Sequence, residues 1–373
     1  MNFAGYFMKR ILVLFFVTLI NFGIGNSKRA YAASSNPETQ DKKYDIVLPK
    51  PIVPENIYID WNGLMKSETI QSIRDNPGKK LEEHVFDPKS ELIKRISFKH
   101  DGILTYLQNL DDNKNYGYYQ PAPTELKDIE KSLNALPLKI RSLLQERLIK
   151  IYFVKDFLGS GYADLLLDKD GKMYFFLVFN PTVLKKTLSQ WAAHKEETCF
   201  IKQKGYELKI KADNSLSGLL GILLHESAHI YDYVYNKTPY VERTVIPLQE
   251  DKQKEHPFTR NYWEEYSLPS KTAKLAWHSR ISFYGGNGGP HIPIDKAPKL
   301  YEQLSLSPFA SLYSIINWAE DFAEFFMLYH LVEVLKSPYR IEILKDGKLL
   351  YDYEPLKSPL QKKRLAWMKD LYK

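Results

Sequence analysis

The sequence from residue 213 to residue 236 reads DNSLSGLLGILLHESAHIYDYVYN. It opens with residues that favour helix N-caps and continues without proline, so it predicts one long helix ending near Asn236. Its segment Leu219–Leu224 is apolar on nearly every side, apart from Gly221. A helix without a polar face is typical of a buried position, so we expect this helix at the centre of the fold.

The same helix carries the pattern HExxH, formed by His225, Glu226 and His229. Residues four apart on a helix differ by about 40° in direction and one turn in height, so both imidazoles can reach one cation. Glu226 lies about 100° from His225 and can act as a general base towards water beside that cation. A pair of hydrogen-bonded core histidines is the alternative, but polar groups inside an apolar helix are costly without compensation. The motif therefore predicts a zinc site.

A second apolar helix is predicted from Ser314 to Leu335. Catalytic zinc usually has three protein ligands and one open position, so two histidines leave one ligand to find. Glu320 and Glu324 are four residues apart and share a face of this helix. An amphipathic helix with solvent-facing acids is the alternative, and it is disfavoured by the aromatic residues around them: Phe322, Phe325 and Phe326. Glu320 and Glu324 are therefore both candidates for the third ligand.

Together the two helices resemble those of gluzincin metallopeptidases, most closely the catalytic domain of the anthrax lethal factor family. The matching residues are an aspartate after the HExxH motif, a tyrosine and an asparagine before the second helix, and an E-x-F-A-E core: Asp232, Tyr313, Asn317, Glu320, Phe322, Ala323 and Glu324. The resemblance covers roughly residues 150–335, and the segment between the motifs is longer here. It implies an α+β fold: a zincin-like domain whose central HExxH helix packs on a small mixed sheet, preceded by an N-terminal extension.

The resemblance also implies roles for single residues. Glu320 would complete the Zn²⁺ site, and Tyr313 would assist catalysis by donating a hydrogen bond to an oxyanion. Asp232 and Glu324 would orient the histidines by accepting their free N–H groups. The implied activity is that of a zinc metalloendopeptidase acting on a peptide or protein substrate, with zinc as the cofactor.

Two other functions remain open on the sequence alone. A zincin fold that binds a partner without turnover is the first, although such a module needs neither Glu226 nor Tyr313. A different zinc hydrolase, such as a peptide deformylase, is the second. That family uses a cysteine as third ligand, and Cys199 lacks the flanking residues of its motif.

Strands are predicted around the motif helix from runs of β-forming residues: Ile151–Val154, Tyr162–Leu167, Met173–Phe179 and Tyr206–Ala212. Asp168–Gly171 separates the second and third runs with hairpin chemistry. Tyr206–Ala212 alternates apolar and charged residues, which indicates a half-buried strand. An extended substrate would pair along a sheet edge, and Tyr206–Ala212 or Met173–Phe179 is the candidate edge.

Helical periodicity marks several other segments, and a hairpin is predicted around Asp346-Gly347. Residues 237–310 are rich in proline, glycine and aromatics and are expected to be irregular. The predicted helices are Thr124–Leu133, Leu138–Leu148, Pro181–Lys195 and a last one beginning near Pro359.

The first residues of the chain read as a signal peptide. Lys9 and Arg10 precede the apolar run Ile11–Ile24, and Ala30-Tyr31-Ala32 then offers a cleavage site. A retained membrane anchor is the alternative, but the run is short for a span of about 20 residues. Residues 1–33 thus predict an exported protein. Beyond them we expect an extension or small domain of unknown role (34–120), the catalytic domain (121–336), and a C-terminal hairpin and helix (337–373).

The charge of the chain is partly a property of that first segment. The 52 basic and 45 acidic residues give a formal net charge of +7, but four of the basic residues and no acid lie within residues 1–33, which leaves +3. The charge therefore gives no reason to expect a nucleic-acid partner. Cys199 is the single cysteine, so no intrachain disulfide can form, and it is predicted to be a buried, inert thiol.

Overall fold

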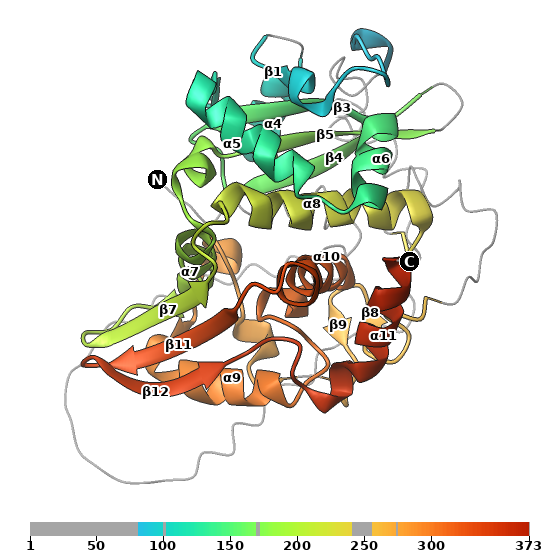
Figure 1. Ribbon diagram of the computed structural model, residues 1–373. Helices are drawn as coiled ribbons and strands as arrows, with labels where there is room; N and C mark the ends of the chain where they lie inside the picture. Colours follow the sequence, from blue (N-terminus) through green and yellow to red (C-terminus); the bar gives the residue numbers. More distant parts are fainter. Residues whose placement is uncertain (1–80, 100–101, 169–171, 241–255, 274, 373) are drawn as a thin grey trace, which may run out of the picture.

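A computed structural model of the chain describes residues 81–372, apart from 100–101, 169–171, 241–255 and 274. The predicted signal peptide and the first part of the predicted extension lie outside the described residues. The remainder is an α+β structure in which a long helix, α8, runs between an upper and a lower part (Figure 1).

The upper part is built on a mixed sheet in which three strands run parallel and two run antiparallel to their neighbours. Two of the predicted strands pair antiparallel, as expected of a hairpin, with Gly161 opposite Phe179 and Leu167 opposite Met173. Most of the turn between them lies outside the described residues. The strand order is β1 (Ile96–Ser97), β3 (Leu148–Lys155), β5 (Met173–Phe179) and β4 (Gly161–Leu167), with β2 (Gly117–Tyr118) also paired to β3.

Alternate side chains of this sheet enter two different hydrophobic cores. Tyr152 and Phe176 face α4 (Ile103–Asp111) on one side, whereas their neighbours Phe153 and Leu177 face the opposite side. The second core is the larger one and also contains apolar residues of α5 (Pro123–Asn134), α6 (Leu138–Arg147) and α8 (Gly218–Tyr235). Because strand residues point alternately to the two faces, both faces of the sheet are covered by helices.

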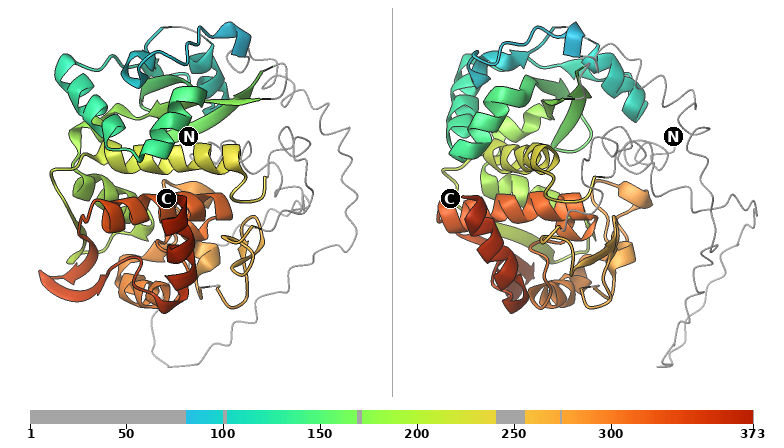
Figure 2. Two further views of the ribbon diagram at one scale, coloured as in Figure 1. Left: turned by 45° about the vertical axis from the view of Figure 1, so that its right-hand side comes forward. Right: turned by 90° about the vertical axis from the view of Figure 1, so that its right-hand side faces the viewer.

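Helix α8 lies where the sequence predicts a central buried helix. Its N-cap is Ser217, whose Oγ accepts a hydrogen bond from the backbone nitrogen of Leu220 at 3.2 Å, and it ends at Asn236 in the left-handed conformation. A Cβ atom at Gly221 would come within 2.4 Å of the Trp191 ring, so only glycine allows this approach of α7 (Leu188–Glu197). Helix α8 packs on the sheet above and on α10 (Trp318–Tyr329) below (Figures 1 and 2).

The lower part contains a second, antiparallel sheet. The alternation predicted for Tyr206–Ala212 is confirmed, since Leu208 and Ile210 are buried while Lys209 and Lys211 are exposed. The hairpin predicted at Asp346-Gly347 is also confirmed, with positive φ at both residues. The strand order is β12 (Lys348–Tyr353), β11 (Tyr339–Lys345) and β7 (Tyr206–Ala212).

The rest of the lower part includes short elements between α8 and α10, a short strand before α8 and a C-terminal helix. The segment 237–310, expected to be irregular, contains the helix α9, so the expectation is wrong there. These elements are α9 (Ala297–Ser305), α11 (Lys362–Leu371), β6 (Phe200–Ile201) paired with β10 (Ile292–Pro293), and β8 (Trp263–Glu265) paired with β9 (Leu268–Pro269).

Two predicted helices are interrupted in the structure. The helix expected over Pro181–Lys195 is a 3₁₀ turn at Pro181–Lys185 followed by α7, because Thr187 forms a new N-cap with Gln190. The helix expected from Ser314 to Leu335 is also divided. It consists of a 3₁₀ turn (Tyr313–Ile315), α10 (Trp318–Tyr329) and a π-helical turn (His330–Val334).

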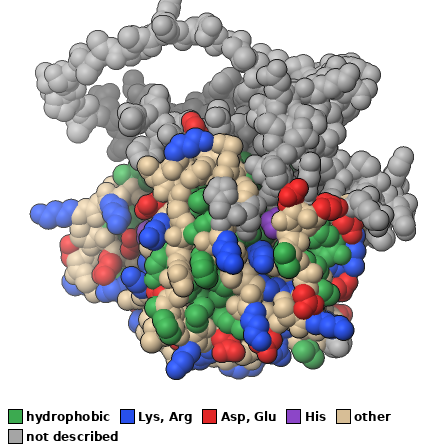
Figure 3. Space-filling model, turned by 90° about the horizontal axis from the view of Figure 1, so that it is seen from above, with side chains coloured by type: hydrophobic (Ala, Val, Ile, Leu, Met, Phe, Trp, Pro, Cys, Tyr) green, Lys and Arg blue, Asp and Glu red, His purple; other side chains and the backbone are tan. Residues whose placement is uncertain are grey.

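Figure 3 shows the upper face of the molecule, where basic and acidic side chains are interspersed. Among the residues that the structure describes, every helix is too short or too polar to cross a bilayer. Cys199 is free and fully buried, and burial raises the pKa of its thiol, as predicted for an inert cysteine.

Candidate metal centre

Three side chains from α8 and α10 converge on one point. The Nε2 atom of His225 lies 3.2 Å from Nε2 of His229 and 3.0 Å from Oε2 of Glu320. The third side of this triangle, from His229 Nε2 to Glu320 Oε2, measures 3.5 Å. The structure thus brings together the three residues that the sequence nominates as ligands.

The local structure explains why Glu320 can reach the histidines. Asn317 precedes α10 in an extended conformation, and its Oδ1 accepts a hydrogen bond from the backbone nitrogen of Glu320 at 2.9 Å. This N-cap places Glu320 in the first turn of α10, opposite the middle of α8. The side chain of His225 is only 6% exposed, whereas those of His229 and Glu320 are 16% exposed. The cluster is therefore mostly buried, and the side chains of His229 and Glu320 reach solvent in small part.

The donor set fits a zinc ion. Two imidazole nitrogens that face each other at 3.2 Å need a proton or a cation between their lone pairs, and a carboxylate oxygen lies at the same point. Imidazole nitrogen with one carboxylate is a donor set that zinc accepts in catalytic sites. In the described part of the chain, no other group of three His, Cys, Asp or Glu side chains has its ligand atoms within 4.8 Å of one another.

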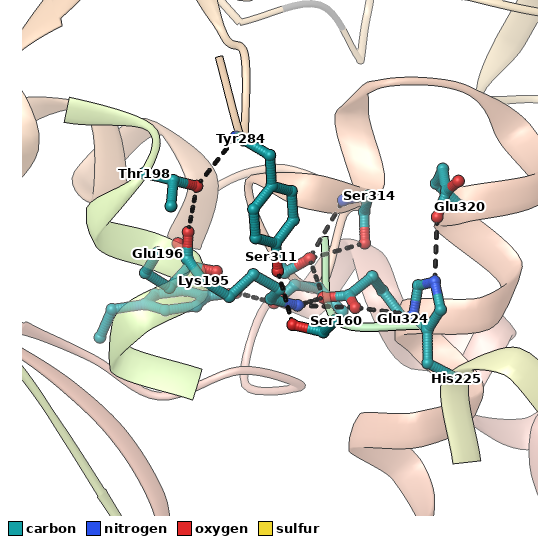
Figure 4. Close-up of polar contacts among 12 residues, drawn as sticks. Ser160, Lys195, Glu196, Thr198, His225, Tyr284, Ser311, Ser314, Glu320 and Glu324 are labelled. Carbon is teal, nitrogen blue, oxygen red and sulfur yellow. Dashed lines mark hydrogen bonds and ion pairs between the residues drawn. The ribbon is translucent and has the colours of Figure 1, made fainter. Parts of the chain in front are cut away.

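Behind the three residues, Glu324 contacts the far side of the His225 ring. Its Oε1 lies 2.9 Å from Nδ1 of His225, on the nitrogen not directed at Glu320 (Figure 4). Lys195 on α7 donates to both oxygens of Glu324 at 2.7 Å, and the hydroxyl of Ser311 donates to Oε2 at 2.7 Å. This is the contact expected of a residue that orients the histidine, although its effect on a metal stays a prediction.

The charges in this cluster shift the pKa of each member. Burial alone would lower the pKa of His225, but hydrogen bonds and charges from Glu320 and Glu324 outweigh it and raise the pKa to about 10. Burial would raise the pKa of Glu320, but the charge of His229 and the hydrogen bond from His225 hold it well below its usual range. The arrangement therefore favours an ionised Glu320 and a strong attraction for positive charge at this point.

Glu226, the predicted catalytic base, is 5% exposed and lies against the strand β4. A Cβ atom at Gly161, the first residue of β4, would stand 3.2 Å from Oε1 of Glu226 and 2.6 Å from Ile222. The glycine thus lets the strand backbone approach the carboxylate closely. Strand β4 is also an outer strand of the upper sheet, at the opposite end of the described strand order from β1.

This position changes the expected substrate edge. Met173–Phe179 (β5) is paired on both sides, with β3 and β4, so the prediction that it offers an edge is wrong. Tyr206–Ala212 (β7) lies at the edge of the lower sheet, where it pairs with β11, so its role as a substrate edge stays a prediction. Strand β4 is the edge that adjoins Glu226, and sequence reasoning did not single it out.

Tyr313, the predicted oxyanion donor, lies beside His225 with the ring centroids 5.8 Å apart. It stands in the 3₁₀ turn that ends three residues before Trp318, the first residue of α10. Burial, followed by the negative charge of Glu320, raises its pKa well above the usual value. Its hydroxyl therefore stays protonated and can donate a hydrogen bond.

Tyr284 is a second phenol near the site that sequence reasoning missed. Its hydroxyl lies 3.3 Å from the hydroxyl of Ser160, next to Gly161, and its ring is 6.5 Å from that of Tyr313. It has a positive φ of 54°, which is uncommon for a residue other than glycine. The glycines that follow Tyr284 in the sequence indicate an unusual backbone, but they do not indicate that Tyr284 lies near the site.

The structure shows different contacts for Asp232 from those expected. Both carboxylate oxygens accept hydrogen bonds from Thr238, at 2.6 Å from its backbone nitrogen and 2.6 Å from its hydroxyl. Burial raises the pKa of Asp232 to about 6, against the effect of these bonds. Asp232 thus ties the end of α8 to the following chain, and an orienting role towards His229 stays a prediction.

Comparisons with protein-family models, with curated proteins and with solved structures gave no match for this chain. The fold and the site define an α+β protein with a two-histidine, one-carboxylate cluster between two buried helices.

Proposed function

We propose that this chain is a zinc-dependent metallopeptidase in which His225, His229 and Glu320 hold the metal. The observation that carries the proposal is the convergence of their three ligand atoms, all within 4.8 Å of one another, at a partly exposed point. The resemblance of the two helices to those of gluzincin peptidases supports the same conclusion. Bound zinc would polarise a peptide carbonyl and lower the pKa of water.

The remaining chemistry falls to the protein's own side chains. Glu226 accepts a proton from the attacking water and returns it to the leaving amine, because it is the carboxylate next to His225 on α8. Tyr313 donates a hydrogen bond to the developing oxyanion, a contribution that can reach a few kcal/mol. Its raised pKa keeps the required proton in place at neutral pH.

We propose that an extended peptide substrate pairs with the outer edge of β4. Backbone pairing with an exposed strand holds a peptide in an extended form irrespective of its sequence. Gly161 supports this assignment, since it brings the strand within contact distance of Glu226. The scissile bond would then lie near both the carboxylate and the metal ligands.

The deciding experiment is zinc analysis of the purified protein together with peptide hydrolysis followed by mass spectrometry. We expect near-stoichiometric zinc in the wild type, much less in Glu320→Gln, and full zinc in Glu226→Gln. Hydrolysis by Glu226→Gln should fall by about 10²- to 10⁴-fold, because a positioned general base contributes that much. Glu333→Gln, a change at the exposed end of the same helical region, is the matched control.

The outcomes separate the competing functions. A wild type without zinc overturns the proposal. Zinc that persists in Glu320→Gln shows that the third ligand is another residue. Zinc in the wild type without hydrolysis of any peptide in a mixed library favours a zincin-fold binding module instead.

A further inference from the structure

Lys195 is a buried lysine that belongs to neither motif helix. It lies near the end of α7 and is 3% exposed. Its Nζ stands 2.7 Å from each oxygen of Glu324, whose side chain is 1% exposed (Figure 4). Burying an ammonium group is costly unless a partner of opposite charge compensates, so this pair fixes both side chains.

The lysine determines how Glu324 meets His225. An ammonium group only donates hydrogen bonds, so Lys195 favours the ionised form of Glu324, which only accepts them. The Oε1 atom of Glu324 then accepts from Nδ1 of His225 at 2.9 Å. With Nδ1 engaged by Glu324, Nε2 is the ring nitrogen left for a metal ion at the point where Glu320 and His229 meet.

The same lysine also contacts the segment that carries Tyr313. Its Nζ lies 5.1 Å from the centroid of the Tyr313 ring, within the range of a cation–π interaction. Ser311 connects Glu324 with the same segment, because its hydroxyl donates to Glu324 and accepts from the backbone nitrogen of Ser314 at 3.0 Å. Lys195 thus contacts both Glu324, the carboxylate behind the proposed metal ligand, and Tyr313, the predicted oxyanion donor.

We propose that Lys195 is a positioning residue, which holds Glu324 and Tyr313 so that His225 presents Nε2 to the metal. The inference rests on the proposed zinc site but does not require peptide hydrolysis. It also accounts for the charge of the site. Three carboxylates, Glu226, Glu320 and Glu324, are offset by one lysine and one divalent cation.

The test is the zinc dissociation constant, measured by competition with a chelator, in a double-mutant cycle. Lys195→Met and Glu324→Gln should each weaken zinc binding by roughly ten-fold or more, the usual effect of removing a partner behind a metal ligand. The double variant should bind zinc no more weakly than the weaker single variant, because Lys195 acts through Glu324. Lys202→Met, which changes an exposed lysine just beyond α7, is the control and should have wild-type affinity. Lys195→Arg keeps the charge and should recover part of the loss.

Each result decides the inference. Wild-type affinity in folded Lys195→Met overturns it, and so do losses in the two single variants that simply add in the double variant. If Lys195→Met fails to fold, the double variant is measured in its place, because it leaves no unpaired charge buried. Affinity equal to that of Glu324→Gln then supports the inference, and weaker affinity overturns it. Absence of zinc from the wild type overturns both this inference and the proposed function, whereas wild-type affinity in Lys195→Met overturns this one alone.

Discussion

Two neighbouring acids of α10, Glu320 and Asp321, enter two different buried charge clusters. Asp321 accepts hydrogen bonds from Arg364 of α11 and, at 2.9 Å, from Nε1 of Trp263. The side chains of Asp321 and Arg364 are 0% and 1% exposed, and a further donor of Arg364 meets the carbonyl of Pro308 at 2.8 Å. One acid is matched by one cation, and the pair is closed to solvent.

The cluster around Glu320 has a different composition. Glu324 pairs with the buried Lys195 and contacts His225, while the imidazoles of His225 and His229 point at the same place as Glu320. Part of this cluster reaches solvent, as the 16% exposure of the Glu320 side chain shows. The comparison teaches that buried charge alone does not mark a functional site. The excess of ligand atoms directed at one partly exposed point is what makes the cluster around Glu320 a candidate site.

The largest expected effect comes from breaking the closed pair. Arg364→Met leaves Asp321 buried without its cation, so the free energy of unfolding should fall by about 3–5 kcal/mol. Chemical denaturation measures this change, and Lys363→Met, at an exposed neighbouring position, should stay within about 0.5 kcal/mol of wild type. Zinc affinity of folded Arg364→Met should be unchanged. A loss of zinc affinity would mean that the two clusters are coupled.

A smaller effect concerns Glu196, a fourth acid behind Lys195. It is 1% exposed, it accepts a hydrogen bond from the Tyr301 hydroxyl, and burial raises its pKa to about 7. Because the pKa is raised in the folded state, its contribution to stability is present below about pH 4.5 and is lost as the pH rises through about 7. Glu196→Gln should therefore remove about 2–3 kcal/mol of the wild-type decline in unfolding free energy between pH 5 and pH 8.

The measurement is denaturant unfolding at several pH values, and Glu197→Gln provides the control. Glu197 is the next residue, but its side chain is 35% exposed and pairs with Lys202 at the surface. Its substitution should leave the pH dependence as in the wild type. Parallel pH curves for wild type and Glu196→Gln would show that Glu196 ionises freely, and that the excess of acid in this cluster has no energetic cost.

The smallest expected effect concerns Asn317, the N-cap residue that places Glu320 in the first turn of α10. Asn317→Ala removes the N-cap of α10 and should lower the free energy of unfolding by about 1 kcal/mol. Asn317→Asp keeps an oxygen acceptor at the cap and should restore most of that loss, as thermal or chemical unfolding can measure. Equal stability of Asn317→Ala and Asn317→Asp would contradict this prediction, because the hydrogen bond at the cap would then contribute nothing to the free energy of unfolding.

Elements with a strong periodic pattern could be predicted from the sequence. The alternation in Tyr206–Ala212 gave a strand with those bounds, and the apolar segment before His225 gave a buried helix. The interruptions of the second helix could not be predicted. Its apolar residues lie on all sides, so no periodic pattern marks where the helix begins and ends. Asn317 was noticed, but its function as an N-cap depends on the extended backbone that precedes α10.

The two histidines could be predicted for a similar reason, since their spacing is local to one helix, whereas Glu320 was nominated by the resemblance of the second helix. Lys195 and Ser311 could not, although they surround Glu324. Lys195 is 129 residues away from Glu324 along the chain, and its helix is brought there by packing against α8. Strand β4 was predicted, but its place at the sheet edge beside Glu226 follows from the strand order.

Helix α8 supplies two of the three proposed ligands and is packed on both sides, against the sheet and against α10. Amide hydrogens of such a segment exchange with solvent only when the whole domain opens. We therefore expect slow exchange in the helix that carries the histidines, and a spacing between them that exists before any ion arrives. If the proposed zinc site is correct, metal uptake is a loading step on a finished scaffold, in contrast to the small zinc domains whose folding waits for the metal.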